Sequence, residues 1–142
     1  MNVYVELLRI AVDFGLMVLI WMVQLLIYPG FEFLAASTFH KWHRKYARNM
    51  TFIVAPMMFV QVFLAGYFII YKPGLQLWNI SYAILVALTW ISTFLIFIPL
   101  HKKLDDEPHN VTVCRKLTHR NWLRVILWTA IVILDVALLI EL

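Results

Sequence analysis

The sequence predicts an all-α fold: a polytopic membrane protein built as a bundle of four transmembrane helices. The chain of 142 residues is 63% hydrophobic and only 14% charged. It contains four long apolar stretches, and a helix needs roughly 20 apolar residues to cross the hydrocarbon core of a bilayer. The mean hydropathy of +0.83 leaves too little polar surface to cover a soluble domain of this size. The alternative is a soluble helical bundle with buried core helices, which this composition does not favour.

The four spans follow from stretches that lack Asp, Glu, Lys and Arg. These stretches are 14–31, 49–71, 73–101 and, apart from Asp135, 125–140. The helices that we expect from them cover about 4–28, 51–71, 76–100 and 120–140. Because these helices use most of residues 1–142, we expect a single four-helix transmembrane domain.

Charged residues inside the first and fourth spans predict a buried ionic contact. Arg9 and Asp13 lie four residues apart on one face of the first helix, and Asp135 lies at a similar depth in the fourth. A charge near the centre of a membrane helix costs at least about 3 kcal/mol, so such residues usually pair. We expect Arg9 to contact Asp13 and Asp135. The alternative is an ion or proton path from Asp13 through Gln24 and Gln61 toward the histidines.

The connection after the first span predicts a short amphipathic helix. A Pro-Gly pair at 29–30 ends or bends the first helix, and the residues that follow favour a new one. On that helix Glu32, His43 and Tyr46 project from one face, and His40 lies close to it. Lysine and arginine side chains occupy the opposite side, as expected for a surface that meets lipid headgroups.

Histidines at the same end of the predicted bundle suggest a metal site. His40 and His43 form a His-x-x-His pair, His101 ends the third span, and His119 begins the fourth. In a four-helix bundle these positions converge, and metal sites in bundles are built from side chains on facing helices. With Glu32, the predicted ligands suit non-heme iron or copper, and heme is the less favoured cofactor. The alternative is that these histidines are interfacial side chains without a ligand.

Three further residues are candidate catalytic groups. Asn121 and Arg124 open the fourth span, where an amide and a guanidinium can hold an anion, a quinone carbonyl or a lipid phosphate. Tyr46 adds a phenol on the histidine-bearing face of the amphipathic helix. The alternative is that Asn121 caps the helix and Arg124 extends to the headgroups.

The distribution of basic residues predicts the orientation. With four spans, both termini share one side with the turn near 72–76, and that side carries Arg9 and Lys72. The basic residues on the other side are Lys41, Arg44, Lys45, Arg48, Lys102, Lys103, Arg115, Lys116, Arg120 and Arg124. The positive-inside rule places this second side in the cytoplasm and both termini outside. We expect an integral protein of the bacterial inner membrane. The pI near 9.4 therefore reflects topology and anionic headgroups, and no nucleic-acid partner is expected.

A set of short motifs at the predicted cytoplasmic ends carries a family resemblance. The motifs are Tyr28-Pro29, His43, Tyr46, Pro56-Met57, Pro99-Leu100-His101 with Leu104, Asn121-Trp122-Leu123-Arg124, and Trp128. This pattern resembles the anthrone oxygenase-like group of small bacterial four-span proteins. Members of that group have a Pro-Leu-Asn or similar triplet at the end of the third helix, where this chain has His101. The resemblance implies a membrane-embedded oxidation of a hydrophobic substrate.

Two classes of function follow from these observations. The first is a redox enzyme that acts on a lipid-soluble small molecule, such as a quinone, at the histidine cluster. The second is a non-catalytic membrane protein, either a small transporter or an accessory subunit of a homo-oligomer or larger membrane complex. A water-filled pore within one chain is not favoured, because few polar side chains line the middle of the spans.

Overall fold

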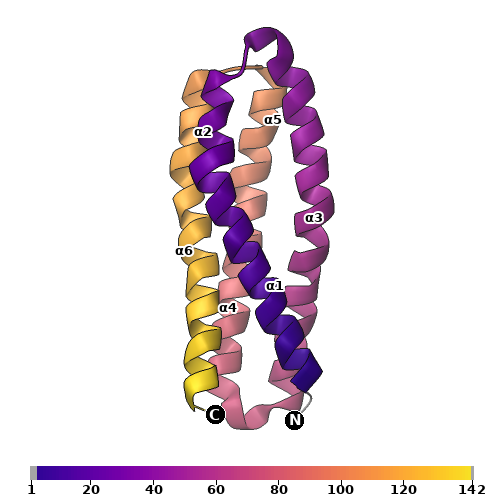
Figure 1. Cartoon of the computed structure of the whole chain (residues 1–142). Helices are drawn as coiled ribbons and strands as arrows, with labels where there is room; N and C mark the ends of the chain where they lie inside the picture. The colour runs from indigo at the N-terminus through magenta and orange to yellow at the C-terminus, as the bar shows by residue number, and fades with distance from the viewer. Residues whose placement is uncertain (1–2, 142) are drawn as a thin grey trace.

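Four long helical segments pack side by side in the computed structural model, which describes the backbone of residues 3–141 and the side chains of 3–140 (Figure 1). They cover Val3–Phe33, Ala36–Tyr71, Pro73–Asp106 and Val111–Ile140, and each is long and apolar enough to span a membrane. The chain is therefore an all-α, four-helix membrane protein, as the sequence predicts. Both ends of the described chain lie at one end of the bundle, together with the turn between the second and third segments (Figure 1).

The segments divide into shorter helical elements. The first contains α1 (Val3–Met22), the π-helical turn η1 (Val23–Ile27), α2 (Tyr28–Gly30) and the 3-10 turn η2 (Phe31–Phe33). The second is the continuous helix α3 (Ala36–Tyr71). The third contains η3 (Pro73–Leu75), α4 (Gln76–Ser92), the π-helical turn η4 (Thr93–Phe97) and α5 (Ile98–Asp106), and the fourth is α6 (Val111–Glu141). We call the end that carries η2 and the α5–α6 turn the basic end, and the opposite end the terminal end.

The predicted amphipathic helix is not a separate element. Its residues from Ala36 onward form the first turns of α3, which continues without interruption into the second span. The helical backbone is interrupted instead at Leu34 and Ala35, which have extended conformations. No Gly or Pro interrupts residues 36–55, so nothing there stops the helix. Glu32 lies before this break, and the helical spacing that relates it to His43 in the sequence does not apply.

Two π-helical turns interrupt the first and third segments at equivalent places. In each case a proline follows two residues after the turn, Pro29 after η1 and Pro99 after η4. A proline has no N–H to donate to the carbonyl one turn earlier, and a π-helical turn shifts the register of the backbone bonds around that gap. Tyr28 directly precedes Pro29 and His101 lies two residues after Pro99, so the shifts help to set the direction of both side chains.

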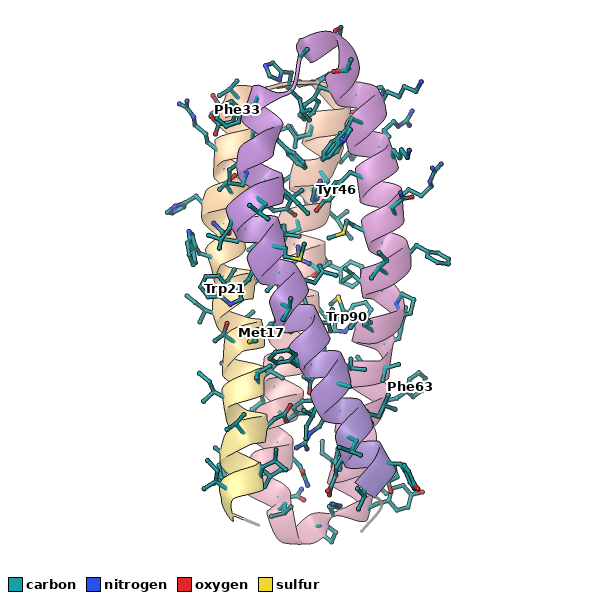
Figure 2. The ribbon with its side chains drawn as sticks, in the orientation of Figure 1. Met17, Trp21, Phe33, Tyr46, Phe63 and Trp90 are labelled. Atoms are coloured by element: carbon teal, nitrogen blue, oxygen red, sulfur yellow. The ribbon has the colours of Figure 1, made fainter. Side chains whose placement is uncertain are left out.

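The surface of the bundle is apolar, as expected for helices in lipid. Phe63 is 76% exposed and points away from the bundle, whereas Tyr46 and Trp90 point between the helices (Figure 2). Leu16 and Trp128 are almost fully buried in the core. Apolar groups on the outside of helices and polar groups on the inside are the arrangement that a hydrocarbon solvent selects.

Buried charges tie the helices together in the terminal half. Arg9 Nε of α1 lies 2.9 Å from Asp135 Oδ1 of α6, and both side chains are buried. This contact confirms the predicted link between the first and fourth helices, whereas no ion pair joins Arg9 to Asp13 within the described residues. Asp13 accepts hydrogen bonds from Gln61 of α3 and Tyr82 of α4. Pairing lowers the cost of placing these charges in the membrane, so we assign the network a structural role.

Candidate functional site

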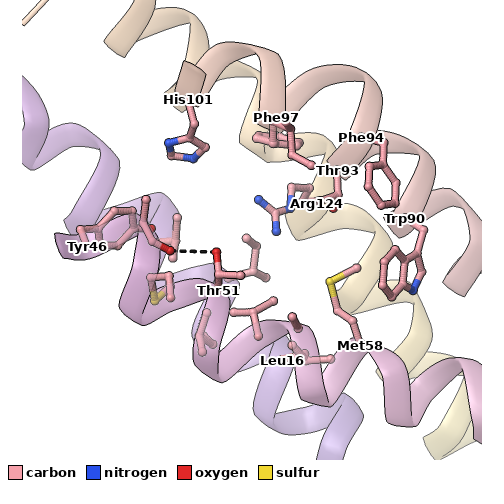
Figure 3. Close-up of a pocket in the computed structure, with 18 of the residues that line it drawn as sticks. Leu16, Tyr46, Thr51, Met58, Trp90, Thr93, Phe94, Phe97, His101 and Arg124 are labelled. Atoms are coloured by element: carbon pink, nitrogen blue, oxygen red, sulfur yellow. Dashed lines mark hydrogen bonds between the residues drawn. The ribbon is translucent and has the colours of Figure 1, made fainter. Parts of the chain in front are cut away.

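A cavity of about 500 Å³ lies in the half of the bundle next to the basic end. Its walls come from all four helical segments and are mostly aliphatic and aromatic. Figure 3 shows His101, Tyr46 and Arg124 around it. Five residues that line the cavity are also exposed on the outside of the bundle: Thr51 and Phe59 of α3, Phe94 of η4, and Ile98 and Lys102 of α5. The cavity therefore opens sideways, toward lipid, between α3 and the η4–α5 segment.

A chain of four polar side chains runs from the cavity to the basic end. The hydroxyl of Tyr28 lies 3.0 Å from His101 Nε2. Nδ1 of His101 lies 2.9 Å from Nε2 of His43, and Nδ1 of His43 lies 3.0 Å from Asp105 Oδ1. All four residues line the cavity, and the Asp105 side chain is 38% exposed whereas that of His43 is 1% exposed. We refer to Tyr28, His101, His43 and Asp105 as the relay.

Helical spacing explains how the relay is assembled. His101 and Asp105 are four residues apart on α5, so both project from the same face of that helix. His43 reaches this face from α3 and bridges the two residues. The last member, Tyr28, comes from α2 directly after the π-helical turn. Three of the four helical segments thus contribute to one line of hydrogen bonds.

Aromatic packing fixes the orientation of His43. The Phe39 ring stacks on the imidazole with 5.6 Å between the ring centroids, and the Phe31 ring meets it edge-on at 5.7 Å. Both phenylalanines are fully buried. An imidazole held in this way keeps its two nitrogens directed at His101 and Asp105, because turning the ring would require the neighbouring rings to move.

When Asp105 is a carboxylate, one set of tautomers satisfies every contact of the relay. An ionised Asp105 can only accept, so Nδ1 of His43 donates to it and Nε2 of the same ring accepts. His101 Nδ1 then donates to His43, and the remaining nitrogen of His101 accepts the hydroxyl proton of Tyr28. Burial favours neutral imidazoles in such a line. All donated protons point from the cavity toward Asp105, so the line can carry a proton in that direction.

Arg124 is the second polar feature of the cavity. The side chain projects from α6 into the space next to Phe97 (Figure 3), and the residue is only 9% exposed. Its guanidinium carbon lies 4.4 Å from the centroid of the Phe97 ring and 5.1 Å from that of Trp128. These distances are within the range of cation–π attraction. The buried Nε has no hydrogen-bond partner among the described residues.

The structure brings together only part of the predicted site. His43, His101, Tyr46 and Arg124 all line the cavity. Asn121 is buried outside it, where its amide donates to Gln24 at 3.0 Å. A polar contact between the first and fourth helices is thus the observed role of Asn121.

The five predicted metal ligands do not converge. His119 is exposed, because it lies on the side of α6 opposite the buried Leu117 and Asn121. Glu32 forms an ion pair with Arg115 at 3.2 Å, and His40 does not line the cavity. Within residues 3–140, no group of three or more His, Cys, Asp or Glu side chains is placed to hold a metal ion. Only His43 and His101 lie together, and they contact each other directly.

Two members of the relay were not among the predicted site residues. Asp105 had a usable signal, since it follows His101 at the helical spacing of four, but the sequence places it in an acidic stretch that resembles a loop tip. In the structure α5 continues through Asp106. The sequence gives a weaker indication for Tyr28, because the direction of its side chain depends on the π-helical turn that precedes it.

No family model, curated protein or solved structure matches the chain. The resemblance to the anthrone oxygenase-like group stays a prediction.

Proposed function

We propose that the protein is a membrane enzyme that removes a proton from a lipid-soluble substrate and passes it to the basic end of the bundle. The observation that carries this proposal is the continuous relay from Tyr28 to Asp105. A substrate dissolved in the bilayer reaches the cavity through its lateral opening without passing through water. The largely apolar walls of the cavity suit such a molecule.

The proton transfer uses one atom of each relay residue after another. The Tyr28 oxygen accepts the proton of the substrate while its own proton moves to Nε2 of His101. His101 releases its Nδ1 proton to Nε2 of His43, which in turn releases its Nδ1 proton to Asp105. The substrate becomes an anion and Asp105 becomes a carboxylic acid. Asp105 is exposed enough to exchange that proton with water, and return of a proton along the same atoms restores the starting state.

The composition of the relay favours this function over a purely structural role. Both nitrogens of both histidines contact side chains that can themselves gain or lose a proton, rather than backbone carbonyls. The line borders the cavity, its Tyr28 end is buried, and its Asp105 end is exposed. A pair of histidines that only stabilised the helix packing would not require this continuity.

The broader predictions from the sequence extend this proposal. Proton transfer accompanies the chemistry of quinones as well as enolisation, so the relay supports the acid–base part of the redox class that the sequence suggests. The proposal includes no electron transfer. We also propose that the basic end faces the cytoplasm of a bacterial inner membrane, as its lysines and arginines predict.

Hydrogen–deuterium exchange on a lipid-soluble ketone tests the proposal. Protein in lipid nanodiscs in D2O would be given 2-tetralone, which has an acidic C–H next to its carbonyl, and mass spectrometry would follow deuterium incorporation. We expect the protein to accelerate exchange and His43→Asn to reduce that acceleration about 100-fold, a typical contribution of a general acid–base group. His119→Asn, an exposed histidine at the same end, is the matched control. Equal acceleration by the wild type and His43→Asn would contradict the proposal.

A further inference from the structure

Arg124 is a buried cation without a protein counter-charge. Several carboxylates among the described side chains already have other partners. These carboxylates are Glu6, Asp13, Glu32, Asp105 and Asp135. Of the remaining described carboxylates, Asp106 and Glu107 are exposed at the basic end. None of the described carboxylates forms an ion pair with Arg124, although a charge inside a membrane protein normally pairs.

The aromatic rings around Arg124 stabilise its positive charge but do not accept hydrogen bonds from its N–H groups. The faces of Phe97 and Trp128 attract the positive charge. The N–H groups of a guanidinium lie in its plane, however, and they need acceptor atoms in that plane. The buried Nε has none within the described structure. Because Arg124 points into the cavity, an oxygen atom of a bound molecule can supply the missing acceptor.

The buried position of Arg124 limits which oxygen-bearing molecules can reach its guanidinium. Arg124 lies four residues, roughly 6 Å along α6, beyond the exposed Arg120, and its side chain is buried inside the bundle. A phosphate headgroup would have to lose most of its hydration to reach this position. A fatty-acid carboxylate could pair with Arg124, but it is already ionised and would have no proton to give to Tyr28. A weak oxygen acid fits both features, because it arrives neutral and becomes an anion next to the guanidinium.

The walls of the cavity indicate the shape of this acid. Tyr46, Phe97 and Trp128 present aromatic rings near Arg124, and Trp90 and Phe94 continue this lining toward the lipid. Flat rings pack well against such walls. The lateral opening leaves space for an alkyl tail to extend into the bilayer.

We propose that Arg124 is an oxyanion site and that the cavity binds a planar aromatic compound with an alkyl tail, whose ring carries a weakly acidic hydroxyl or an enolisable carbonyl. This inference rests on the proposed function. In the transfer step the O–H or C–H bond of the ligand breaks and the proton passes to the Tyr28 oxygen. The electron pair of that bond stays on the ligand, where the negative charge on its oxygen pairs with Arg124.

A coloured weak acid tests the inference without requiring turnover. An alkyl-substituted 2-hydroxy-1,4-naphthoquinone absorbs differently as the neutral acid and as the anion. We would add it to protein in nanodiscs at a pH at which the free compound in empty nanodiscs is neutral. The wild type should bind it and produce the anion spectrum. Arg124→Met should remove the anion spectrum and weaken binding roughly tenfold or more, as expected when a charged hydrogen-bond partner is lost. Arg120→Met, an exposed arginine on the same helix, is the matched control.

Two additional ligands keep the test independent of the fold of the Arg124 variant. The methyl ether of the same naphthoquinone has no acidic proton and should bind the wild type roughly tenfold more weakly. Palmitate should not displace the coloured compound at comparable concentration. Binding of the neutral form only, equal binding of the ether, or displacement by palmitate would each overturn the inference. The two proposals fail separately, because the exchange assay with His43→Asn measures the relay and this assay measures the anion at Arg124.

Discussion

Nε2 of His43 lies 2.9 Å from Nδ1 of His101, so two imidazoles on different helices form a direct hydrogen bond inside a membrane protein. The residues are 58 positions apart in the sequence. Their contact joins α3 to α5, the two segments between which the cavity opens toward lipid. The same contact places a titratable group from each helix between Tyr28 and Asp105.

The exposed end of the relay should be required for proton transfer. Asp105→Asn keeps the size and a hydrogen-bonding oxygen at this position but cannot take up the proton from His43. We expect the protein-dependent deuterium exchange of 2-tetralone to fall about 100-fold. The measurement is the same mass-spectrometric assay in nanodiscs. Asp106→Asn changes the neighbouring exposed carboxylate and should leave exchange unchanged. A similar loss in both variants would point to surface charge rather than to the relay.

The network in the terminal half should stabilise the bundle without contributing to the cavity. Asp135→Ala leaves Arg9 buried without its partner, and breaking a buried pair typically costs about 3–5 kcal/mol. Asp135→Asn can still accept a hydrogen bond and should be milder. Thermal unfolding in one detergent would be compared for the wild type and both variants. Wild-type-like melting of Asp135→Ala would mean that this ion pair does not hold α1 and α6 together.

The basic end should face the cytoplasm. In a Cys114→Ala background, single cysteines would replace Gln76 at the terminal end and Asp106 at the basic end. A membrane-impermeant maleimide added to intact cells should label the cysteine at position 76 and not that at position 106. Permeabilised cells provide the control, because both positions are exposed and should then react. The opposite pattern would place the exposed end of the relay outside the cytoplasm.

The fold could be predicted from the sequence because the membrane requires long uninterrupted apolar helices. The positions of the four spans and the contact between Arg9 and Asp135 follow from length, composition and the cost of an unpaired charge. The start of α3 could not be predicted in the same way. The sequence signal for a bend is the Pro-Gly pair at 29–30, whereas the chain turns at Leu34 and Ala35, which have no turn-forming side chains.

The candidate site could be predicted only in part, because it depends on which face of each helix turns inward. His43, His101, Tyr46 and Arg124 could be grouped from their common end of the bundle. His119 lies at that end too but faces outward, since Leu117 and Asn121 occupy the inner face of α6. The π-helical turns before Tyr28 and His101 shift the register of two helices. Periodicity in the sequence does not reveal such shifts.

The positions of the protons on His43 and His101 test the central claim most directly. Nitrogen-15 NMR of histidine-labelled protein in nanodiscs distinguishes a proton on Nδ1 from one on Nε2 and from a charged imidazolium, and His43→Asn and His101→Gln would assign the signals. The relay predicts that both rings are neutral, carry their proton on Nδ1 and accept a hydrogen bond at Nε2. It also predicts that Tyr28→Phe changes the Nε2 signal of His101. A proton on Nε2 of either ring, or a charged ring at neutral pH, would contradict a relay that runs from the cavity to Asp105.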